Sequence, residues 1–264
     1  MTPPESELAG RVAIITGAGR GIGLAIARNF CEAGATAVIA ELDADAGEQA
    51  AQALRDEGHD AWARQCDVRS RESVDALVEA VQTRHGCIDI LVNNAGMNFV
   101  SPTECQPDSD WHLQVDVMLN GVFICTRAVG TVMLRQQSGV ILNISSIAGY
   151  GAWPLRSAYD AVKAAVISLT ENVGCEWARR GVRVVSVAPG VTRTNILQSL
   201  VDQGVASLDQ YNRRTPMGRV ADVEEIASVA RFLVSDRASY ITATTLAVDG
   251  GWVAWDGLPG KAAV

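Results

Sequence analysis

Residues 12–30 read Val-Ala-Ile-Ile-Thr-Gly-Ala-Gly-Arg-Gly-Ile-Gly-Leu-Ala-Ile-Ala-Arg-Asn-Phe. The first five residues form a β-branched run typical of a buried strand, and the residues after Gly23 have the apolar spacing of a helix. Between them, Gly17, Gly21 and Gly23 allow a tight turn and a close backbone approach at the start of that helix. The free N–H groups of the helix and the positive end of its dipole then suit a pyrophosphate. The segment therefore predicts the strand, loop and helix of a dinucleotide-binding fold.

The rest of the chain repeats this alternation of short β-branched runs and longer helical stretches. Several runs are apolar on both faces, which is expected where helices cover both sides of a parallel sheet. Right-handed crossovers then produce a doubly wound, Rossmann-type α/β sheet, and without a linker or internal repeat residues 1–264 are expected to form one domain. Strands are predicted at 12–16, 37–40, 88–92, 140–144, 182–187 and 245–248, and helices at 22–33, 44–57, 70–85, 109–136, 157–179 and 223–234. The least regular segment is 191–219.

Composition and charge narrow the classes of partner. With 48% hydrophobic and 20% charged residues the chain lies in the ordinary range of folded globular proteins, so neither a disordered nor a fibrous class is indicated. The formal net charge of −8 and the isoelectric point near 4.9 repel phosphate backbones and anionic membrane surfaces. Neither nucleic acid nor a membrane is therefore expected as a partner.

The cysteines and the N-terminus indicate a reducing compartment. The six cysteines include no Cys-x-x-Cys pair and no clustered histidine, so no zinc site or redox dithiol is predicted, and we expect them to be buried as small apolar residues. Met1–Gly10 lacks the basic start and apolar stretch of a secretory signal, and no run of about 18 apolar residues follows. A cytoplasmic location without a metal is expected.

An acidic residue follows the strand predicted at 37–40. Glu41 lies roughly 20 residues beyond the glycine loop, where a carboxylate accepts hydrogen bonds from both hydroxyls of an adenosine ribose. Glu41, followed by Leu42 and Asp43, would repel the 2′-phosphate of NADP, which favours NAD. Arg20 in the loop could reach a phosphate, so NADP stays open. A Rossmann-like methyltransferase shares this loop and acidic residue, so the discriminating chemistry lies further along the chain.

Three residues in the second half of the chain supply that chemistry. Tyr159 and Lys163 are spaced i,i+4 on the helix predicted at 157–179, so they rise on one face. An ammonium in a dry cleft can lower the tyrosine pKa from about 10 toward neutrality. Ser146 follows the strand predicted at 140–144, and ligands of an open α/β sheet collect beyond the carboxyl ends of its strands. Ser146 and Tyr159 are therefore expected to converge on one substrate oxygen.

These motifs resemble the short-chain dehydrogenase/reductase family, in its compact single-domain branch, over nearly the whole chain. Asn93-Asn-Ala-Gly96 is similar to the motif after the family's fourth strand, and Asp249-Gly-Gly251 to the end of its C-terminal strand. The chain departs from the pattern at Val162, where serine is common, and at Ala243, where glycine is frequent. The resemblance implies a catalytic set of Asn120, Ser146, Tyr159 and Lys163. It implies cofactor contacts from Tyr159 and Lys163 and from Gly17, Arg20, Gly21, Ile22, Gly23, Glu41, Leu42, Asp67, Val68, Asn94, Ala95, Gly96, Pro189, Gly190, Val191 and Thr194.

The resemblance implies hydride transfer between NAD(H) and a secondary alcohol or ketone. Tyr159 would move the proton and Ser146 would polarise the substrate oxygen. Lys163 would bind the nicotinamide ribose and lower the tyrosine pKa, and Asn120 would hold a water that relays protons from Lys163. The alternatives are a non-catalytic dinucleotide-binding sensor and an NADPH-dependent 3-oxoacyl reductase. A methyltransferase does not need the combination of Ser146, Tyr159 and Lys163, so that alternative is excluded.

The substrate pocket is implied to lie in the loops after the strands at 88–92, 140–144 and 182–187, with 191–219 as a lid. Its candidate contacts, besides Ser146 and Tyr159, are Asn98, Ala148 and Trp153. Apolar walls are expected from Trp153, Phe99 and Tyr150, and polar contacts from Asn98 and Arg156, which favours a small sugar, polyol or cyclic alcohol. Trp252 and Trp255 either close the pocket or pack at a subunit contact. Family members are commonly tetramers, so a homotetramer built on the helices at 109–136 and 157–179 is expected.

Overall fold

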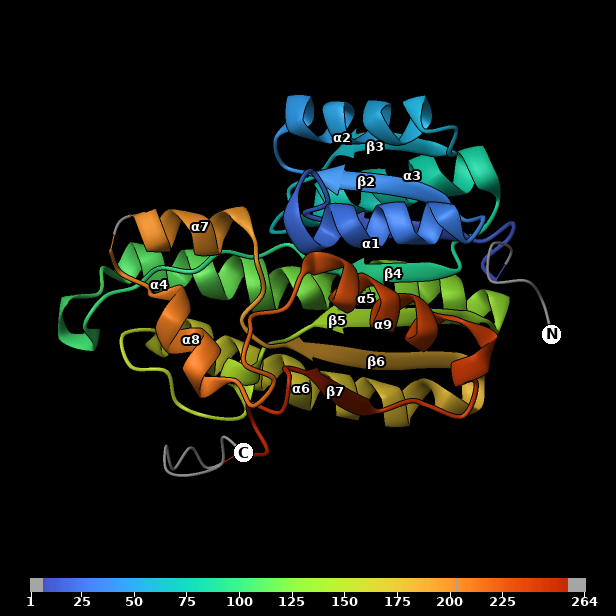
Figure 1. The fold of residues 1–264 in the computed structure, drawn as a ribbon. Coiled ribbons are helices and arrows are strands. Elements are labelled where there is room, and N and C mark those ends of the chain that lie inside the picture. The colour runs from blue at the N-terminus through green and yellow to red at the C-terminus, as the bar shows by residue number, and fades with distance from the viewer. Residues whose placement is uncertain (1–6, 203, 256–264) are drawn as a thin grey trace.

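A parallel sheet forms the centre of the computed structural model, which describes residues 7–202 and 204–255. In this part of the chain the sheet has seven strands in the order β3-β2-β1-β4-β5-β6-β7. The order reverses between β1 and β4, and the arrowheads of the strands point toward the end of the sheet where α4, α7 and α8 lie (Figure 1). The strands are β1 (Val12–Thr16), β2 (Thr36–Glu41), β3 (Ala61–Gln65), β4 (Ile90–Asn93), β5 (Gly139–Ile144), β6 (Val182–Pro189) and β7 (Thr244–Val248).

Helices cover both faces of the sheet and confirm the doubly wound class. Strand β1 alternates between two apolar clusters: Ala13 and Ile15 face one, and Val12 and Ile14 face the other. This is why the strands read as apolar on both faces in the sequence. The first cluster includes α1 (Gly21–Glu32), α2 (Ala44–Asp56) and α9 (Val223–Val234), and the second includes α3 (Arg71–His85), α5 (Gly121–Gln136) and α6 (Ser157–Trp177).

The sequence prediction missed the edge strand β3. Only Ala61 of this strand is buried, and exposure increases toward Arg64 and Gln65. An edge strand with one half-solvated face has no long β-branched run, so its apolar signal is weak. Trp62 is half-buried against the cluster that includes α3, and its indole Nε1 donates to Nε2 of His85 in α3 over 3.0 Å.

The helix predicted at 109–136 is continuous but not uniform. It comprises α4 (Asp108–Val115), a π-helical turn (Asp116–Asn120) and α5. By length and composition this stretch could cross a membrane, but 56% of its most apolar window is buried inside the fold, as in a core helix. A π-helical turn shifts the side chains after it around the helix axis, and such turns are frequent at functional sites.

The segment expected to be irregular, 191–219, contains two helices, α7 (Asn195–Asp202) and α8 (Leu208–Arg214). Its two ends are joined at the base. Thr192 and Ala221 form a parallel bridge, the Ala221 N–H donates to Val191 O over 2.9 Å, and the Arg193 N–H donates to Ala221 O over 2.8 Å. The segment predicted as a lid is therefore a loop whose stem is closed by backbone hydrogen bonds.

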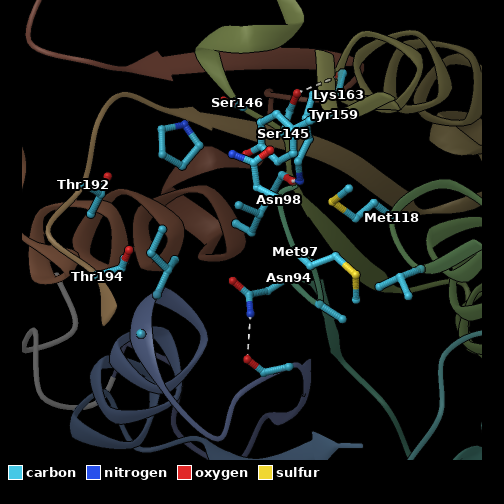
Figure 2. Close-up of a pocket in the computed structure, with 18 of the residues that line it drawn as sticks. Asn94, Met97, Asn98, Met118, Ser145, Ser146, Tyr159, Lys163, Thr192 and Thr194 are labelled. Carbon is cyan, nitrogen blue, oxygen red and sulfur yellow. Dashed lines mark hydrogen bonds between the residues drawn. The ribbon is translucent and has the colours of Figure 1, made fainter. Parts of the chain in front are cut away.

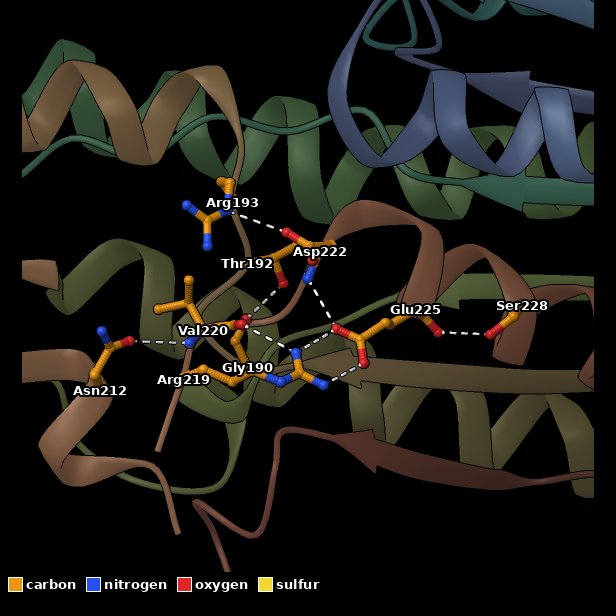
Figure 3. A network of polar contacts seen from close by, with 9 residues as sticks. All are labelled: Gly190, Thr192, Arg193, Asn212, Arg219, Val220, Asp222, Glu225 and Ser228. Atoms are coloured by element: carbon orange, nitrogen blue, oxygen red, sulfur yellow. Dashed lines mark hydrogen bonds and ion pairs between the residues drawn. The ribbon is translucent and has the colours of Figure 1, made fainter. Parts of the chain in front are cut away.

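Ion pairs and a capping box at the start of α9 hold the same stem (Figure 3). The backbone N–H of Asp222 donates to the Glu225 carboxylate over 3.0 Å, and Arg219 Nη1 lies 2.6 Å from Glu225 Oε2. The guanidinium lowers the pKa of Glu225 to about 2. Arg193 Nε lies 3.1 Å from Asp222 Oδ1, so cations from both arms of the lid converge on the first turn of α9.

All six cysteines have free thiols, but they are not all buried as expected. Cys31, Cys66 and Cys125 are buried and Cys87 is half-buried, whereas Cys105 and Cys175 are exposed. The prediction was wrong for these two because cysteine type alone does not tell which face of an element a side chain occupies.

Candidate active site

A cavity of about 620 Å³ opens at the carboxyl ends of the central strands, between the glycine loop and the lid. It is lined by residues that follow the strands β1 to β6, by α4 and the π-helical turn, and by α6, α7 and α8. This is the position expected for a ligand in an open α/β sheet, beyond the point where the strand order reverses. Figure 2 shows Ser146, Tyr159 and Lys163 gathered at one side of this cavity and Thr192 and Thr194 at another.

The glycine loop is closely packed on the side that faces Asn94 and Ala95, and it is open at Gly21. A Cβ on Gly17, whose φ is +62°, would lie 2.7 Å from the Cα of Ala95, and a Cβ on Gly23 would lie 2.5 Å from Asn94 Nδ2. A Cβ on Gly21, whose φ is +61°, would meet nothing within 4 Å. Helix α1 begins at Gly21, so its unpaired N–H groups face this open space. The loop therefore fits the pyrophosphate of a dinucleotide.

The loop is also fixed to the neighbouring strand. Asn94 Nδ2 donates to the carbonyl oxygens of Thr16 and Gly17, each over 2.9 Å, and the Thr16 hydroxyl accepts the backbone N–H groups of Asn94 and Ala95. These hydrogen bonds join the carboxyl end of β1 to the carboxyl end of β4 and so fix the loop to the sheet. A rigid loop loses little conformational freedom when it binds a ligand.

Acidic groups lie at the adenosine end of the cavity. Glu41 Oε2 accepts the N–H of Gly19 over 3.0 Å, and Glu41 Oε1 accepts the N–H of Leu42 over 2.9 Å. The Asp67 carboxylate pairs with Arg69 over 2.7 Å, and this pairing lowers the pKa of Asp67. Glu41 is thus placed beside the loop, where a ribose would bind.

Ser146, Tyr159 and Lys163 meet at the end of β5. The Ser146 hydroxyl accepts the N–H of Ala148 over 3.1 Å and hydrogen-bonds the Tyr159 phenol. Lys163 is buried, its Nζ donates to Ile144 O over 2.7 Å, and it lies 5.5 Å from the centroid of the Tyr159 ring. The i,i+4 spacing does place the tyrosine and lysine on one face of α6.

The pKa of Tyr159 moves in the direction opposite to the sequence expectation. Burial raises the pKa of the phenol, while the hydrogen bond with Ser146 and the charge of Arg156 oppose the rise. Burial lowers the pKa of Lys163 to about 8, and its ammonium is directed to a backbone carbonyl. In this structure desolvation outweighs the nearby charges, so the phenol keeps its proton at neutral pH.

The lowered pKa of Lys163 makes stability depend on pH. The unfolded chain, with a lysine pKa of 10.5, holds this proton more tightly than the folded chain, so the folding penalty is complete below pH 8 and is relieved as the pH rises toward 10.5. The free energy of unfolding, relative to Lys163→Met, should therefore rise by about 3 kcal/mol at most across that range. Urea unfolding of both proteins at several pH values measures this difference, and parallel pH profiles would contradict the burial of a charged lysine.

Most residues predicted for the site line this cavity, and two do not. The structure brings together Gly17, Arg20, Gly21, Ile22, Glu41, Leu42, Asp67, Val68, Asn94, Ala95, Gly96, Asn98, Ser146, Ala148, Trp153, Tyr159, Lys163, Pro189, Gly190, Val191 and Thr194. Gly23 lies behind the loop, where its role is packing. Asn120 is exposed, and its Nδ2 donates to Asp116 Oδ1 over 2.8 Å. Its assignment as a catalytic residue is therefore corrected.

The π-helical turn presents Met118 to the cavity instead of Asn120 (Figure 2). Met118 is buried against Val122, Val162 and Val166. A thioether accepts hydrogen bonds only weakly, so the Met118 side chain is a poor partner for the relay water that was expected at an asparagine. Sequence spacing could not distinguish the two positions, because both fall within the turn that changes the helical register.

The substrate end of the cavity is partly aromatic. Trp153 and Tyr211 line it, and Trp153 stacks on Trp252, with ring centroids 5.1 Å apart. Trp252 thus supports the wall from behind. Phe99 and Tyr150, which were expected in the walls, are absent from the lining, and the Tyr150 hydroxyl donates to Thr245 O over 3.2 Å. Some lining residues were not predicted from the sequence, because their positions depend on the loop after β4, on segment 191–219 and on the π-helical turn. They are Met97, Met118, Thr192, Leu197, Leu200 and Tyr211.

Asn98 has an unused acceptor in the same cavity as the reacting groups. Its Oδ1 is buried and has no hydrogen-bond donor in residues 7–202 and 204–255. Asn98, Ser146 and Tyr159 all line this cavity (Figure 2). A buried acceptor without a partner is costly, so a ligand hydroxyl or amide in this cavity would find a favourable site here.

Known proteins share this fold and most of its length. Residues 17–253 match the family model described as Enoyl-(Acyl carrier protein) reductase. The 3beta-hydroxysteroid dehydrogenase 1 of Eggerthella lenta is 38% identical over 254 residues, which cover 95% of this chain and 97% of that protein. The cis-4-hydroxycyclohexanecarboxylate dehydrogenase of Sinomonas cyclohexanicum is 39% identical over 246 residues, which cover 92% of this chain and 97% of that protein.

A solved structure bears on the choice of cofactor. The crystal structure of a gluconate 5-dehydrogenase from Burkholderia cenocepacia, in complex with NADP and tartrate, has a TM-score of 0.90 and 38% identity, and the match covers 96% of this chain and 98% of that one. Because that neighbour binds NADP, the expectation that NADP is the less favoured cofactor is not upheld. The comparisons favour neither NAD nor NADP as the cofactor of this chain.

Proposed function

Since the chain belongs to the short-chain dehydrogenase/reductase family and is an oxidoreductase of that family, we propose that it transfers a hydride between a nicotinamide dinucleotide and a secondary alcohol or ketone. One observation carries this proposal. The Tyr159 phenol, hydrogen-bonded to Ser146, opens into the same cavity as the glycine loop. A proton donor and a dinucleotide cradle in one cavity are what such a reaction needs.

Ser146 and Tyr159 act on the same substrate oxygen. Ser146 donates a hydrogen bond that polarises it, and Tyr159 Oη exchanges the proton with it. The glycine loop would hold the pyrophosphate, Glu41 the adenosine ribose and Lys163 the nicotinamide ribose. When bound, the dinucleotide supplies the hydride acceptor or donor. A phenol that keeps its proton at neutral pH is in the state required for ketone reduction, because reduction needs a proton donor at this position.

The choice between NAD and NADP depends on Glu41. Its carboxylate would meet the 2′-phosphate of NADP, whereas Arg20 and Arg69 on the cavity wall would attract it. We expect Glu41→Gln to shift the ratio of kcat/KM values toward NADP by about 10-fold or more, since like charges a few ångströms apart cost on the order of 1–4 kcal/mol.

Steady-state kinetics with both cofactors measure this ratio. Asp45→Asn is the matched control, because it removes the same charge from an exposed position of α2 outside the cavity lining. An unchanged ratio in Glu41→Gln, or an equal shift in Asp45→Asn, would contradict a direct contact between Glu41 and the adenosine ribose.

We propose a cyclic or polyhydroxylated secondary alcohol as substrate. The aromatic wall of Trp153 and Tyr211 suits a carbon ring, and the unused Oδ1 of Asn98 suits a second hydroxyl. A spectrophotometric screen with NAD and with NADP tests this against 4-hydroxycyclohexanecarboxylate, a 3β-hydroxysteroid and gluconate. Oxidation of at least one of them supports the proposal.

Two alternatives are decided by the same screen. Tight dinucleotide binding without turnover of any secondary alcohol or ketone would favour a non-catalytic sensor. Turnover confined to a 3-oxoacyl thioester with NADPH would favour an acyl reductase, the activity named for a Synechocystis relative, a 3-oxoacyl-[acyl-carrier-protein] reductase that is 38% identical over 250 residues. For assembly we propose a homotetramer, supported by the exposed Trp111 and Phe123 on α4 and α5. The location that we propose is the cytoplasm.

A further inference from the structure

An arginine without an anionic partner lies at the substrate end of the cavity. Arg156 lines the cavity immediately before α6 and is half-buried. In residues 7–202 and 204–255 its guanidinium has no carboxylate within ion-pair distance and no hydrogen-bond acceptor. Half-buried guanidinium groups usually bind a planar anion, because their N–H donors match it in pairs.

Carboxylates are confined to one end of the cavity wall. Glu41 and Asp67 lie at the adenosine end together with Arg20 and Arg69, whereas the charged side chains that line the substrate end are Arg156 and Lys163. The nearest acidic side chain to Arg156 on α6, Asp160, does not line the cavity, and its Oδ2 accepts the N–H of Trp153 over 2.7 Å. In a chain of net charge −8 this end is locally cationic, which favours an anionic substrate.

The backbone that carries Arg156 is held in an unusual conformation. Leu155 has a φ of +72°, in the left-handed region that leucine rarely adopts, and its carbonyl accepts the N–H of Ser101 over 2.9 Å. The Asp160 N–H donates to Arg156 O over 2.9 Å. Strained residues persist where surrounding contacts hold them, and they are frequent at ligand sites. The conformation of this turn therefore fixes the position of Arg156 at the cavity.

An apolar surface adjoins the cation. The Arg156 guanidinium lies 5.3 Å from the centroid of the Trp153 ring, and Tyr211 lies 6.1 Å from Trp153, centroid to centroid. Both aromatic side chains line the cavity, and Trp252 supports Trp153 from outside the lining. The site therefore offers one guanidinium beside a carbon-binding wall.

We propose that the substrate is a hydroxy acid, whose carboxylate binds Arg156 and whose carbon skeleton packs on Trp153 and Tyr211. This rests on the proposed dehydrogenase function. In oxidation the Tyr159 phenol would first lose its proton to solvent, and the phenolate would then take the O–H proton of the substrate. The carbinol C–H bond would break with its hydride passing to the bound oxidised dinucleotide, a C=O bond would form, and the carboxylate would remain unchanged as part of the oxo acid.

Matched pairs of substrates isolate the carboxylate. The pairs are 4-hydroxycyclohexanecarboxylate with its carboxamide and gluconate with sorbitol. We expect the wild-type protein to prefer the acid of at least one pair. Arg156→Met should lower kcat/KM for that acid by about 10- to 100-fold, mainly through KM, because a charge-assisted pair is lost, and should change the neutral partner by less than about 3-fold. Arg156→Lys should recover part of the loss.

The control variant is Arg213→Met, which removes the same charge from α8. Arg213 pairs with Asp209 and does not line the cavity, so the acid preference should not change. Equal effects of Arg156→Met and Arg213→Met would assign the preference to the general field of the protein. That result would overturn a contact between Arg156 and the substrate.

A binding measurement separates this inference from the proposed function. Cyclohexanecarboxylate, which cannot be oxidised, should change the tryptophan fluorescence of the wild-type protein through Trp153 and not that of Arg156→Met, and cyclohexanecarboxamide should affect neither. If no alcohol is turned over but this response is present, the proposed function fails and the anion site stands. If neutral alcohols are oxidised as well as acids and Arg156→Met changes nothing, the anion site fails and the dehydrogenase stands.

Discussion

Tyr159→Phe is expected to lower kcat/KM by about 100- to 10,000-fold, the range associated with loss of a general acid or base. The substitution removes only the hydroxyl that hydrogen-bonds Ser146 and leaves the ring that packs beside Met118 and Val162. Phenylalanine cannot donate or accept a proton, so the substrate oxygen would depend on water. Because the ring is retained, the fold and the cofactor cradle should persist.

Two measurements separate chemistry from folding in this variant. Dinucleotide affinity by titration calorimetry and the thermal unfolding midpoint should match those of the wild-type protein, while turnover of the best substrate in the screen falls. Turnover within about 10-fold of the wild-type value would show that proton transfer runs through another group. An equal loss of dinucleotide affinity would show that the hydroxyl acts mainly in binding.

Gly17→Ala should destabilise the fold by about 3 kcal/mol or more and thereby abolish dinucleotide binding. Two costs add at this position. An alanine must adopt a φ of +62°, and its Cβ would lie 2.7 Å from the Cα of Ala95, a backbone atom that cannot move without shifting β4. Overpacking of this kind typically costs about 1–3 kcal/mol beyond the backbone strain.

Gly21→Ala is the matched control, because its φ of +61° is nearly the same but its Cβ would meet no protein atom within 4 Å. We expect a smaller loss of stability, about 1 kcal/mol from the backbone alone. The Cβ would project into the space above the loop, so dinucleotide affinity should fall although the protein is folded. Urea unfolding and calorimetry measure the two effects, and equal destabilisation by both variants would contradict the close packing of Gly17 on β4.

Local features of the chain were predictable from the order and spacing of residues. The run Val12–Thr16, the glycine loop and helix α1 follow one another without a gap, so their juxtaposition needs no information from elsewhere in the chain. The i,i+4 spacing of Tyr159 and Lys163 likewise determines that they share a helix face. Parallel strands then bring the end of β5, with Ser146, to the same edge of the sheet as the glycine loop.

Only the tertiary structure decided which side chains face the cavity and whether burial or nearby charge controls the pKa of a side chain. The π-helical turn directs Met118 inward and Asn120 to solvent, a rotation invisible to a period of 3.6 residues. Desolvation raises the pKa of Tyr159 despite the lysine one turn away, because the cost of burial depends on every element packed around the phenol. Arg156 acquires its position from the left-handed turn at Leu155 and the ring of Trp153, contacts that no local pattern encodes. Backbone order and helical spacing are local properties, whereas exposure and electrostatic balance are sums over distant parts of the chain.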